Sequence, residues 1–482
     1  MSDTRTKIVC TIGPSSRDAE ILRALIRAGM DVARINFSHG TKEEHAQVIT
    51  AIRALAREEG RPIAIMADLQ GPKLRIGALV HEPLVLKEGD RVVFSADRES
   101  GPGNVVNLPH PDLISDLCVG DPILLDDGTF EFIVEEKMPG ELVCRVIVGG
   151  ELYSRKGVAA PRTGTGRESQ VAAITAKDKE DIICALEYGV DFIALSFVRC
   201  AADIEELRVL IGGEKEGPAI VAKIEKRAAL DDFDRILAAT DAVMVARGDL
   251  GVEVSVEEVP LYQKEIICKC NAVGKPVITA TQMLQSMILN PTPTRAEAGD
   301  VANAILDGTD AVMLSGETAI GRYPVRAVEV MARISATVEE KMPCWVDKVD
   351  FADVEHMHSI TAAISDATAT IAKNLGTRLI VASTWSGYTA RQIARERPRE
   401  SIIAFTPNAT TFTRLALTWG VQPLLVPQYR NTEEMLEMMA HTVIKLNLAR
   451  PGDLIIVTGA IPLREGGRTD FLKVHRLDEG EA

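Results

Sequence analysis

Several features are scarce in this chain of 482 residues, and each scarcity argues against a class of protein. No apolar stretch approaches the roughly 20 residues that a membrane-spanning helix needs, so no membrane partner is expected. Acidic residues outnumber basic ones, 69 to 54, which disfavours a protein that binds nucleic acid through a basic surface. The eight cysteines include no CxxC pair, a pattern that favours buried reduced thiols over disulfides or zinc.

The remaining composition is that of a soluble globular protein. Hydrophobic residues make up 46% of the chain and charged residues 26%, and the length allows two to four domains. The first seven residues lead directly into a predicted strand, without the apolar segment of a signal peptide. We therefore expect a cytoplasmic protein.

Predicted strands and helices alternate in two blocks that together contain eight strands. In the first block the predicted helices are 19–28 and 42–59, and the strands are 7–12, 31–37 and 62–67. The second block begins with a predicted helix at 177–188, and its strands are 191–197, 219–224, 242–246, 276–281 and 311–315. Eight such units favour a (β/α)₈ barrel built from residues 1–70 and 162–341, with its chemistry at the C-terminal ends of the strands. A doubly wound sheet is the main alternative.

Two further regions have a different character. Between residues 71 and 161 helical periodicity disappears and short alternating runs are separated by turns such as Asp127-Gly128 and Pro139-Gly140. This pattern predicts an inserted small β-barrel domain that closes over a site as a lid. Residues 342–482 predict a separate α/β domain, with a helix at 360–375 and strands at 379–383, 402–405, 423–426 and 454–458.

The most informative residues follow two adjacent predicted strands. Lys223 and Glu225 end one apolar run, and Asp249 follows the next. Buried parallel strands read as continuous apolar runs, so these charges are expected where the strands emerge. Two carboxylates and an ammonium group there can hold a hard divalent cation beside a phosphoryl group. The alternative is that they are ordinary solvated charges at strand ends.

Other predicted strands also end in polar groups. Alternation places Arg34, Asn36 and Ser38 on one side of the second strand, and a guanidinium group is suited to bind a phosphate through two hydrogen bonds. His39 follows and is either a nucleotide contact or a plain surface residue. Thr281 ends the seventh strand, although threonine is also common in buried strands.

The third strand runs into a charged loop that contains Asp68, Lys73 and Arg75 around Gly71-Pro72. The loop lies at the junction with the inserted region. Gly-Pro pairs also mark simple turns, so a hinge is the alternative interpretation.

These motifs together resemble the pyruvate kinase family along nearly the whole chain. The segments that carry the resemblance occur in family order: Thr11 to Pro14, Asn36-Phe-Ser-His-Gly40, Asp68-x-x-Gly-Pro72, Lys223-Ile-Glu225, Ala246 to Gly251, Ala280 to Met283 and Met313 to Thr318. The resemblance implies transfer of the phosphoryl group of phosphoenolpyruvate to ADP, giving ATP and pyruvate. It also implies the three regions described above, and it suggests a homotetramer.

The resemblance implies a role for each matching residue. Glu225 and Asp249 are expected to bind Mg²⁺ or Mn²⁺, and Lys223 to stabilise charge on the phosphoryl group and the enolate oxygen. Arg34 is expected to bind the phosphoryl group. The backbone amides of Gly248 and Asp249, with Thr281, are expected to hold the carboxylate of the substrate. The expected nucleotide contacts are Arg75, Lys156, His39 and Asn36.

The family's monovalent cation site is altered in this chain. Many pyruvate kinases need K⁺ and carry Glu and Thr where this chain has Lys73 and Leu69, so the loop resembles the potassium-independent branch. The ammonium group of Lys73 is expected to replace K⁺ beside Asp68, Asn36 and Ser38. We therefore expect that K⁺ is not required.

A loop in the C-terminal region resembles the family's effector site, where sugar phosphates bind. Its hydroxyl-bearing residues and glycine stand between a predicted strand and a helix, where backbone amides can bind phosphate: Ser383, Thr384, Ser386, Gly387 and Thr389. A plain helix cap is the alternative interpretation. A sugar phosphate or a nucleotide is the expected effector.

Two other functions stay open at this point. A metal-dependent lyase or aldolase acting on pyruvate enolate would use a similar barrel without needing the lid, Lys156 or Arg75. A non-enzymatic metabolite-binding regulator is the other option, although it would be expected to have lost Lys223, Glu225, Asp249 or Arg34.

Overall fold

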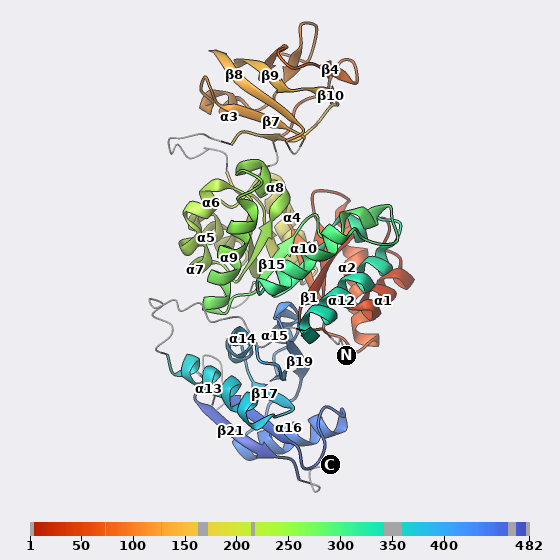
Figure 1. The fold of residues 1–482 in the computed structure, drawn as a ribbon, viewed down its shortest axis with the longest axis vertical. Helices are drawn as coiled ribbons and strands as arrows, with labels where there is room; N and C mark the ends of the chain where they lie inside the picture. Colours follow the sequence, from red (N-terminus) through yellow and green to blue (C-terminus); the bar gives the residue numbers. More distant parts are fainter. Residues whose placement is uncertain are drawn as a thin grey trace.

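The protein is described by a computed structural model that covers residues 4–72, 74–126, 128–161, 172–213, 217–341, 359–460 and 469–478. Three parts are arranged along its long axis (Figure 1): the inserted β-domain at one end, a barrel in the middle and the C-terminal domain at the other end. Among the described helices, none combines the length and the apolar character that crossing a membrane requires.

The middle part is a closed barrel of eight parallel strands, which confirms the predicted fold and excludes the doubly wound sheet. Its strands are β1 (Lys7–Ile12), β2 (Val32–Asn36), β3 (Ala64–Asp68), β12 (Phe192–Leu195), β13 (Ala219–Ile224), β14 (Ala242–Ala246), β15 (Val277–Ala280) and β16 (Ala311–Leu314). Three of them have the predicted bounds, and the other five are shorter or displaced by one or two residues at their ends.

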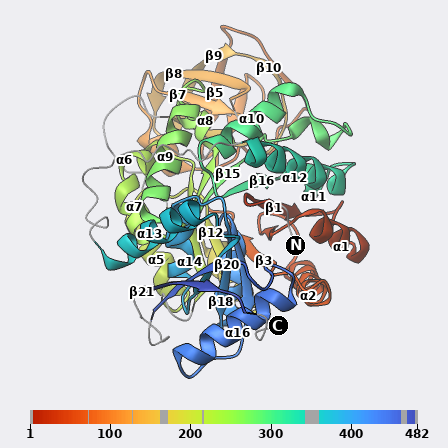
Figure 2. The same cartoon turned by 60° about the horizontal axis from the view of Figure 1, so that its bottom comes forward.

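The outer layer of the barrel is helical (Figures 1 and 2). Its elements are α1 (Ala19–Ala28), α2 (Lys42–Glu58), α4 (Ala176–Glu187), α5 (Ala201–Leu210), α6 (Arg227–Asp231), α7 (Phe233–Ala239), α8 (Arg247–Glu253), α9 (Val259–Val273), η1 (Gln285–Ile288), α10 (Arg295–Leu306), α11 (Gly316–Ala319) and α12 (Pro324–Lys341). Capping boxes fix where several of these helices begin, as at Thr41 and Glu44 of α2.

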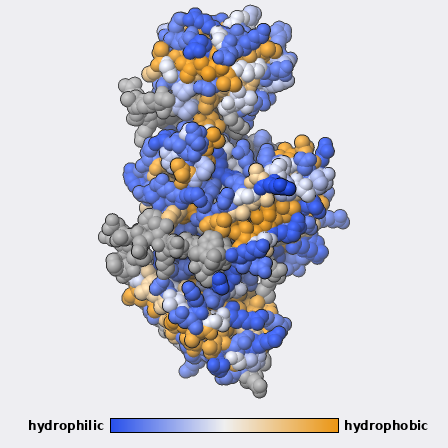
Figure 3. Space-filling view, viewed as in Figure 1, coloured by the Kyte–Doolittle hydropathy of each residue, from blue (hydrophilic) through white to orange (hydrophobic). Residues whose placement is uncertain are grey.

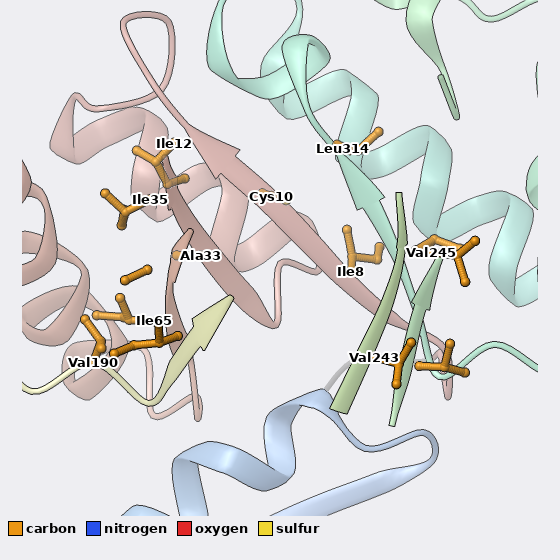
Figure 4. Close-up of a cluster of buried hydrophobic side chains, with 14 of the residues drawn as sticks. Ile8, Cys10, Ile12, Ala33, Ile35, Ile65, Val190, Val243, Val245 and Leu314 are labelled. Carbon is orange, nitrogen blue, oxygen red and sulfur yellow. The ribbon is translucent and has the colours of Figure 1, made fainter. Parts of the chain in front are cut away.

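Alternation along the strands produces two apolar cores on opposite faces of the barrel wall. Ile8 and Cys10 point outward into the layer between strands and helices (Figure 4). Val9, between them, points inward to a second cluster that fills the barrel. A parallel strand with apolar residues on both faces needs cover on both, which explains the continuous apolar runs in the sequence.

An aspartate precedes every second strand of the barrel and fixes its N-terminal end. Asp31, Asp191, Asp241 and Asp310 stand immediately before β2, β12, β14 and β16. Each accepts a hydrogen bond from a backbone N–H of the preceding strand, at 2.7–3.0 Å. Each also pairs with an arginine, in the same order Arg61, Arg53, Arg208 and Arg397. These pairs therefore join neighbouring strands at the end opposite the predicted site.

The inserted domain has its own core. Its elements are β4 (Leu84–Leu86), β5 (Arg91–Ser95), β6 (Val105–Asn107), α3 (Pro111–Asp116), β7 (Pro122–Leu125), β8 (Phe130–Met138), β9 (Glu141–Val148), β10 (Gly150–Leu152) and β11 (Val158–Ala159). They form a six-stranded sheet and a two-stranded sheet, with Phe94 and Phe132 packed edge to face at 5.2 Å. The sequence did not predict α3, β6, β10 or β11, which are short and lack clear periodicity.

The C-terminal domain is a five-stranded sheet with helices. Its elements are α13 (Ile360–Leu375), β17 (Leu379–Ser383), α14 (Tyr388–Arg395), β18 (Ser401–Thr406), α15 (Ala409–Arg414), η3 (Leu415–Leu417), β19 (Val421–Leu425), α16 (Thr432–Lys445), β20 (Leu454–Gly459) and β21 (Phe471–Arg476). The strand β21, which is antiparallel to β20, was not predicted.

This domain closes the N-terminal end of the barrel. Ala416 and Leu417 belong to the apolar cluster inside the barrel. Lys7, at the start of β1, donates from Nζ to the carbonyl oxygen of Val421 at 2.8 Å. The opposite, C-terminal end of the strands faces the inserted domain (Figure 1). The residues predicted at the ends of barrel strands lie there, since Asn36 and Asp68 are the last residues of β2 and β3 and Lys223 is the last but one of β13.

Candidate active site

The ammonium group of Lys223 is the centre of the site. Lys223 is the fifth residue of β13 and is 9% exposed. Its Nζ lies 2.9 Å from Oε1 of Glu225, 3.2 Å from Oδ1 of Asp68 and 2.7 Å from Oγ of Ser196. Burial alone would lower the pKa of Lys223, but the charges of Asp68 and Glu225 outweigh burial and raise it. The amine is therefore a fixed positive charge.

Asp68 connects Lys223 to the guanidinium group of Arg34. Arg34 donates from Nε to Oδ2 of Asp68 at 2.6 Å and from Nη1 to Oγ1 of Thr11 at 2.8 Å. Burial alone would raise the pKa of Asp68, but Arg34 and Lys223 outweigh it and leave the pKa lowered. One buried carboxylate thus orients both cations that were predicted to contact the phosphoryl group.

Glu225 and Asp249 provide the chemistry that a divalent cation needs. Glu225 is 1% exposed, and its pKa is raised by burial and by the nearby charge of Asp249, against the opposing effect of Lys223. Its Oε1 has no hydrogen bond of normal geometry within the described structure, although the Lys223 amine is close. Two hard oxygen donors, one of them buried and repelled by the other, fit a divalent cation. The described residues contain no group of three or more His, Cys, Asp or Glu arranged for a metal.

A strained turn follows β15 and positions Thr281. Thr281 and Gln282 have positive φ angles of 69° and 56°, which only a well-supported backbone keeps. Arg247 provides the support, since it donates to the carbonyl oxygens of Ala280 at 3.2 Å and Thr281 at 2.7 Å. The hydroxyl of Thr281 donates to the Ala280 carbonyl oxygen at 2.6 Å and accepts the N–H of Gly248 at 2.8 Å.

Comparison with known proteins shows which family this chain belongs to. A family model described as pyruvate kinase, barrel domain, matches residues 3–328, and one described as pyruvate kinase, alpha/beta domain, matches residues 362–475. The chain belongs to the pyruvate kinase family. The prediction of a phosphotransferase is therefore confirmed, and the enolate lyase is not favoured. Members of this family generally need a divalent metal ion.

Individual relatives agree over almost the whole chain. The pyruvate kinase of Geobacillus stearothermophilus is 46% identical over 478 residues, which are 98% of this chain and 81% of that protein. The pyruvate kinase of Agrobacterium vitis is 45% identical, over 99% of this chain and 97% of its own length. Among solved structures, a pyruvate kinase from Cryptosporidium parvum superposes with a TM-score of 0.90 at 35% identity, covering 98% and 96% of the two chains.

Two residues expected at the family's monovalent cation site, Asn36 and Asp68, end the neighbouring strands β2 and β3, and Ser38 and Leu69 come just after these strands. Asn36 pairs with Asp68 in the register of these strands, and Oδ1 of Asn36 accepts the N–H of Ser38 at 3.1 Å. The side chain of Leu69 is buried in the outer core. Lys73 lies outside the described residues.

The expected nucleotide contacts are spread over the barrel and the inserted domain. His39 is exposed after β2, and Arg75 lies where the chain enters the inserted domain, donating from Nη1 to the Arg155 carbonyl oxygen at 2.8 Å. Lys156 lies where the chain returns and pairs with Asp126 at 2.9 Å. The two chain segments that connect the barrel to the inserted domain are paired with each other, since Arg75 forms an antiparallel β-bridge with Gly157.

Sequence reasoning missed three residues that shape the site. Ser196 accepts from Lys223 and donates to the Leu69 carbonyl oxygen at 2.7 Å. Phe197, with a φ of +56°, donates its N–H to Oε2 of Glu225 at 2.7 Å. Thr11 accepts from Arg34. Ser196 follows β12, so the same search for polar residues at strand ends would have found it.

The predicted effector loop connects β17 to α14. Three of its residues are buried, and two of these form side-chain bonds: the Ser383 hydroxyl with that of Tyr429, and Oγ1 of Thr389 with Oγ1 of Thr469 at 2.8 Å. The third, Thr384, donates its N–H to the Phe405 carbonyl oxygen at 3.0 Å. Ser386 is exposed, and Gly387, with a φ of +80°, begins α14 without a side-chain cap.

Proposed function

We propose that the pyruvate kinase reaction, in which phosphoenolpyruvate phosphorylates ADP to give ATP and pyruvate, takes place at the C-terminal end of this barrel. The observation that carries the proposal is the position of Lys223, whose Nζ lies 2.9 Å from Glu225 and 3.2 Å from Asp68 in a buried site. Phosphoryl transfer requires mainly positioning and neutralisation of charge, which such a group of fixed charges supplies.

Glu225 and Asp249 are the proposed ligands of Mg²⁺ or Mn²⁺. Two carboxylates leave the remaining coordination positions to substrate oxygens and water, which is the usual arrangement for Mg²⁺ beside phosphates. The bound ion would neutralise charge on the phosphoryl and enolate oxygens. The backbone N–H of Phe197 donates to Oε2 of Glu225, so the orientation of the Glu225 carboxylate does not depend on the ion.

Arg34 and Lys223 are the proposed contacts of the phosphoryl group, and Lys223 also stabilises the enolate oxygen. Both share Asp68, which keeps their separation fixed as charge moves between substrates. Gly248, Asp249 and Thr281 are the proposed contacts of the substrate carboxylate. Because Thr281 donates its hydroxyl hydrogen to the backbone, we propose that it acts on the enolate by positioning water.

The central test replaces Lys223 by Met. We expect Lys223→Met to lower kcat at least about 1,000-fold, because no other group replaces the fixed positive charge. The melting temperature should stay within a few degrees of the parent. The control is Lys264→Met, which removes an exposed lysine paired with Asp307 on the barrel surface and should leave kcat unchanged. Normal turnover by Lys223→Met would refute the mechanism.

Independence from K⁺ is proposed from Lys73 and Leu69. Activity measured in tetramethylammonium at constant ionic strength should be close to that in K⁺. The matched variant Lys73→Glu restores the residue that K⁺-dependent members carry, and should make activity depend on K⁺. A many-fold activation of the parent enzyme by K⁺ would show the proposal to be wrong.

The inserted domain is proposed to close over the site and bring Arg75 and Lys156 to the ADP phosphates, together with His39 and Asn36. The pairing of the two connecting segments supports this proposal, because both connections between the barrel and the inserted domain then lie at one place, where the domain can hinge. The proposed domain boundaries remain 1–70 with 162–341, 71–161 and 342–482. Protection of Lys156 from acylation by ADP in the presence of Mg²⁺ tests the closure, and equal reactivity with and without ADP would contradict it.

Regulation and assembly complete the proposal. The loop from Ser383 to Thr389 is proposed to bind a sugar phosphate or a nucleotide, because the uncapped start of α14 offers backbone amides to an anion. Calorimetry that detects no binding of either class would remove this idea.

A cytoplasmic homotetramer is also proposed. The apolar band over α10 and α12 in Figure 3 supports the tetramer, and sedimentation velocity tests it.

A further inference from the structure

Four basic side chains from two domains lie near one another where the barrel meets the C-terminal domain. Lys275 and Arg208 donate to carbonyl oxygens of the successive residues 237–239. Across the contact, a Cβ placed on Gly274, beside Lys275, would lie 3.7 Å from the carbonyl oxygen of Arg391, and one placed on Gly387 would lie 3.0 Å from both Nη1 of Arg391 and the side chain that follows Arg414. Arg208 on α5 and Lys275, just before β15, come from the barrel. Arg391 on α14 and Arg414 at the end of α15 come from the C-terminal domain. None of the four side chains is fully exposed. They lie at the N-terminal end of the barrel strands, on the side opposite the proposed active site.

Hydrogen bonds hold these side chains in place, but mostly to backbone carbonyl groups. Lys275 donates from Nζ to the carbonyl oxygens of Leu237 at 2.6 Å and Ala238 at 3.0 Å. Arg414 donates from Nη2 to that of Gly217 at 2.5 Å, and its buried Nε has no hydrogen-bond partner in the described structure.

The other two residues connect this group to its surroundings. Arg391 donates from Nη1 to the carbonyl oxygen of Ser386 at 3.2 Å. Arg208 donates from Nη2 to that of Ala239 at 2.8 Å and pairs through Nη1 with Asp241 at 2.7 Å. Within the described residues, Arg208 is the only one of the four that forms an ion pair.

Among the residues that the structure describes, the charges around this group do not balance. Asp241 is the one described carboxylate that acts on Lys275, Arg391 and Arg414 alike, and it is already paired with Arg208. Asp191 also acts on Arg414, but it pairs with Arg53 and accepts a hydrogen bond from Thr413.

The pKa values of these cations reflect the imbalance. Burial lowers the pKa of Lys275, of Arg391 and of Arg414, and in each case a neighbouring arginine of the group lowers it further. Positive charges that are partly removed from water and repel one another destabilise the contact unless an anion joins them.

We propose that Arg208, Lys275, Arg391 and Arg414 form a phosphate-binding site between the barrel and the C-terminal domain, separate from the loop at Ser383–Thr389. A phosphate dianion supplies the charge that Asp241 cannot, and its oxygens match the fork of a guanidinium group. The ligand is inorganic phosphate or the phosphate group of a small metabolite. Because both domains contribute cations, occupancy would tighten the contact between them.

The test measures phosphate binding to the full chain by calorimetry and by melting temperature, with chloride at equal ionic strength as reference. Inorganic phosphate should bind the parent and raise its melting temperature. Arg414→Gln should weaken phosphate binding at least about 10-fold, because a charge-assisted pair is lost. Arg414→Lys, which keeps the charge, should retain most of the affinity and shows that loss in the Gln variant is electrostatic. Lys275→Gln provides a second test if Arg414→Gln does not fold.

Two further variants separate this proposal from general loosening of the domain contact. Arg395 also crosses the contact, from Nη1 to the Ala272 carbonyl oxygen at 3.4 Å, but it pairs with Glu396. Arg395→Gln should therefore keep the parent phosphate affinity. Asp241→Asn removes the competing carboxylate and should strengthen phosphate binding, a gain that a purely structural role of the group would not produce.

The results that overturn the proposal are specific. The proposal is wrong if the parent protein does not bind phosphate, or if Arg414→Gln and Lys275→Gln both keep the phosphate affinity of the parent. If affinity is lost in Ser386→Ala and retained in Arg414→Gln, the phosphate occupies the loop at the start of α14 and the interface site is wrong. Parallel titrations with a hexose monophosphate and a nucleoside monophosphate identify the source of the phosphate: tighter binding that still depends on Arg414 indicates a metabolite, and equal affinity indicates inorganic phosphate. None of these readouts depends on catalytic activity.

Discussion

The two ends of the barrel use charged side chains for opposite purposes. At the C-terminal end, three carboxylates, Asp68, Glu225 and Asp249, face two cations, Arg34 and Lys223. At the N-terminal end, each of the four aspartates that precede alternate strands has its own arginine. The residues at the C-terminal end carry one more negative than positive charge, which favours the binding of a cation. The pairs at the N-terminal end balance their charges and join the strands of the barrel.

The difference teaches where this fold tolerates unbalanced charge. Three of the four pairs at the N-terminal end have carboxylate side chains that are 7–8% exposed, and their function is to join neighbouring strands. The exception is Asp241, with a side chain 39% exposed and three extra cations nearby. In the part of the chain that the structure describes, each end thus has one imbalance, a surplus of negative charge at the C-terminal end and of positive charge at the N-terminal end.

The largest expected effect tests the acidic surplus. Glu225→Gln keeps the shape of the side chain and its bond from Phe197 but removes the charge. We expect the dissociation constant for Mn²⁺ to rise at least about 100-fold and kcat to fall by about 1,000-fold. Mn²⁺ binding is measured by electron paramagnetic resonance without substrates. Asp241→Asn is the matched control from the opposite end and should leave Mn²⁺ affinity unchanged; a comparable loss there would break the comparison.

An intermediate effect tests the structural pairs. Asp310 accepts from the backbone of Val277 at 3.0 Å and pairs with Arg397 at 3.3 Å, in a buried position. Asp310→Asn leaves Arg397 buried without its counter-charge, so we expect the free energy of unfolding to fall by about 3 kcal/mol. Chemical denaturation measures it.

Two variants calibrate that result. Asp241→Asn should lower the free energy of unfolding by less, about 1 kcal/mol, because the pair of Asp241 with Arg208 is more exposed. Replacing Arg397 by Met in the Asp310→Asn background should recover part of the loss, since the unpaired charge is removed. If the double variant is as unstable as Asp310→Asn, the unpaired charge is not the cause.

The smallest expected effect comes from three charged residues that lie at neither end of the barrel. Glu59 joins α1 to α2 through hydrogen bonds from Arg27 and Arg23, which lower its pKa to about 2. Because the folded pKa lies below the unfolded value, Glu59 contributes stability above about pH 4.5 and loses it as pH falls toward 2. Glu59→Gln should lower the melting temperature by only about 1–2 °C at pH 7, because the pair is near the surface.

The measurement for Glu59 is a series of melting curves from pH 7 to pH 3. The difference between parent and Glu59→Gln should stay constant down to about pH 4.5 and then shrink. A difference that grows as pH falls would contradict the assignment of the low pKa to Glu59.

Much of the fold and part of the site could be predicted from the sequence. The strands β1, β13 and β14 were predicted with correct bounds because they are apolar on both faces and have clear stop signals, which are Gly13-Pro14 after β1 and the charged residues Glu225 and Arg247 after β13 and β14. The meeting of Lys223 with Glu225 followed from their positions at a strand end. In contrast, α3, β6, β10 and β11 were missed because tertiary packing, and not a periodic pattern, holds such short elements in place.

The network around Lys223 could not be predicted in detail. Ser196 follows a strand and Thr11 belongs to a family motif, but neither position reveals its partner, because only barrel closure brings their hydroxyls to Lys223 and Arg34. The basic group at the domain contact was not predicted at all. Its four residues span positions 208 to 414 and share no local pattern, so only the packing of two domains reveals it.

The sequence by itself determined which strands are buried, which charges stand at their ends and which family the residues resemble, because these depend on local alternation and residue chemistry. Only the tertiary structure decided which charges share a partner. A charge is balanced or unbalanced by neighbours that lie close in space, and the electrostatic energy depends on those distances and on burial. For that reason the shared Asp68 and the uncompensated cations around Asp241 became visible only in the folded chain.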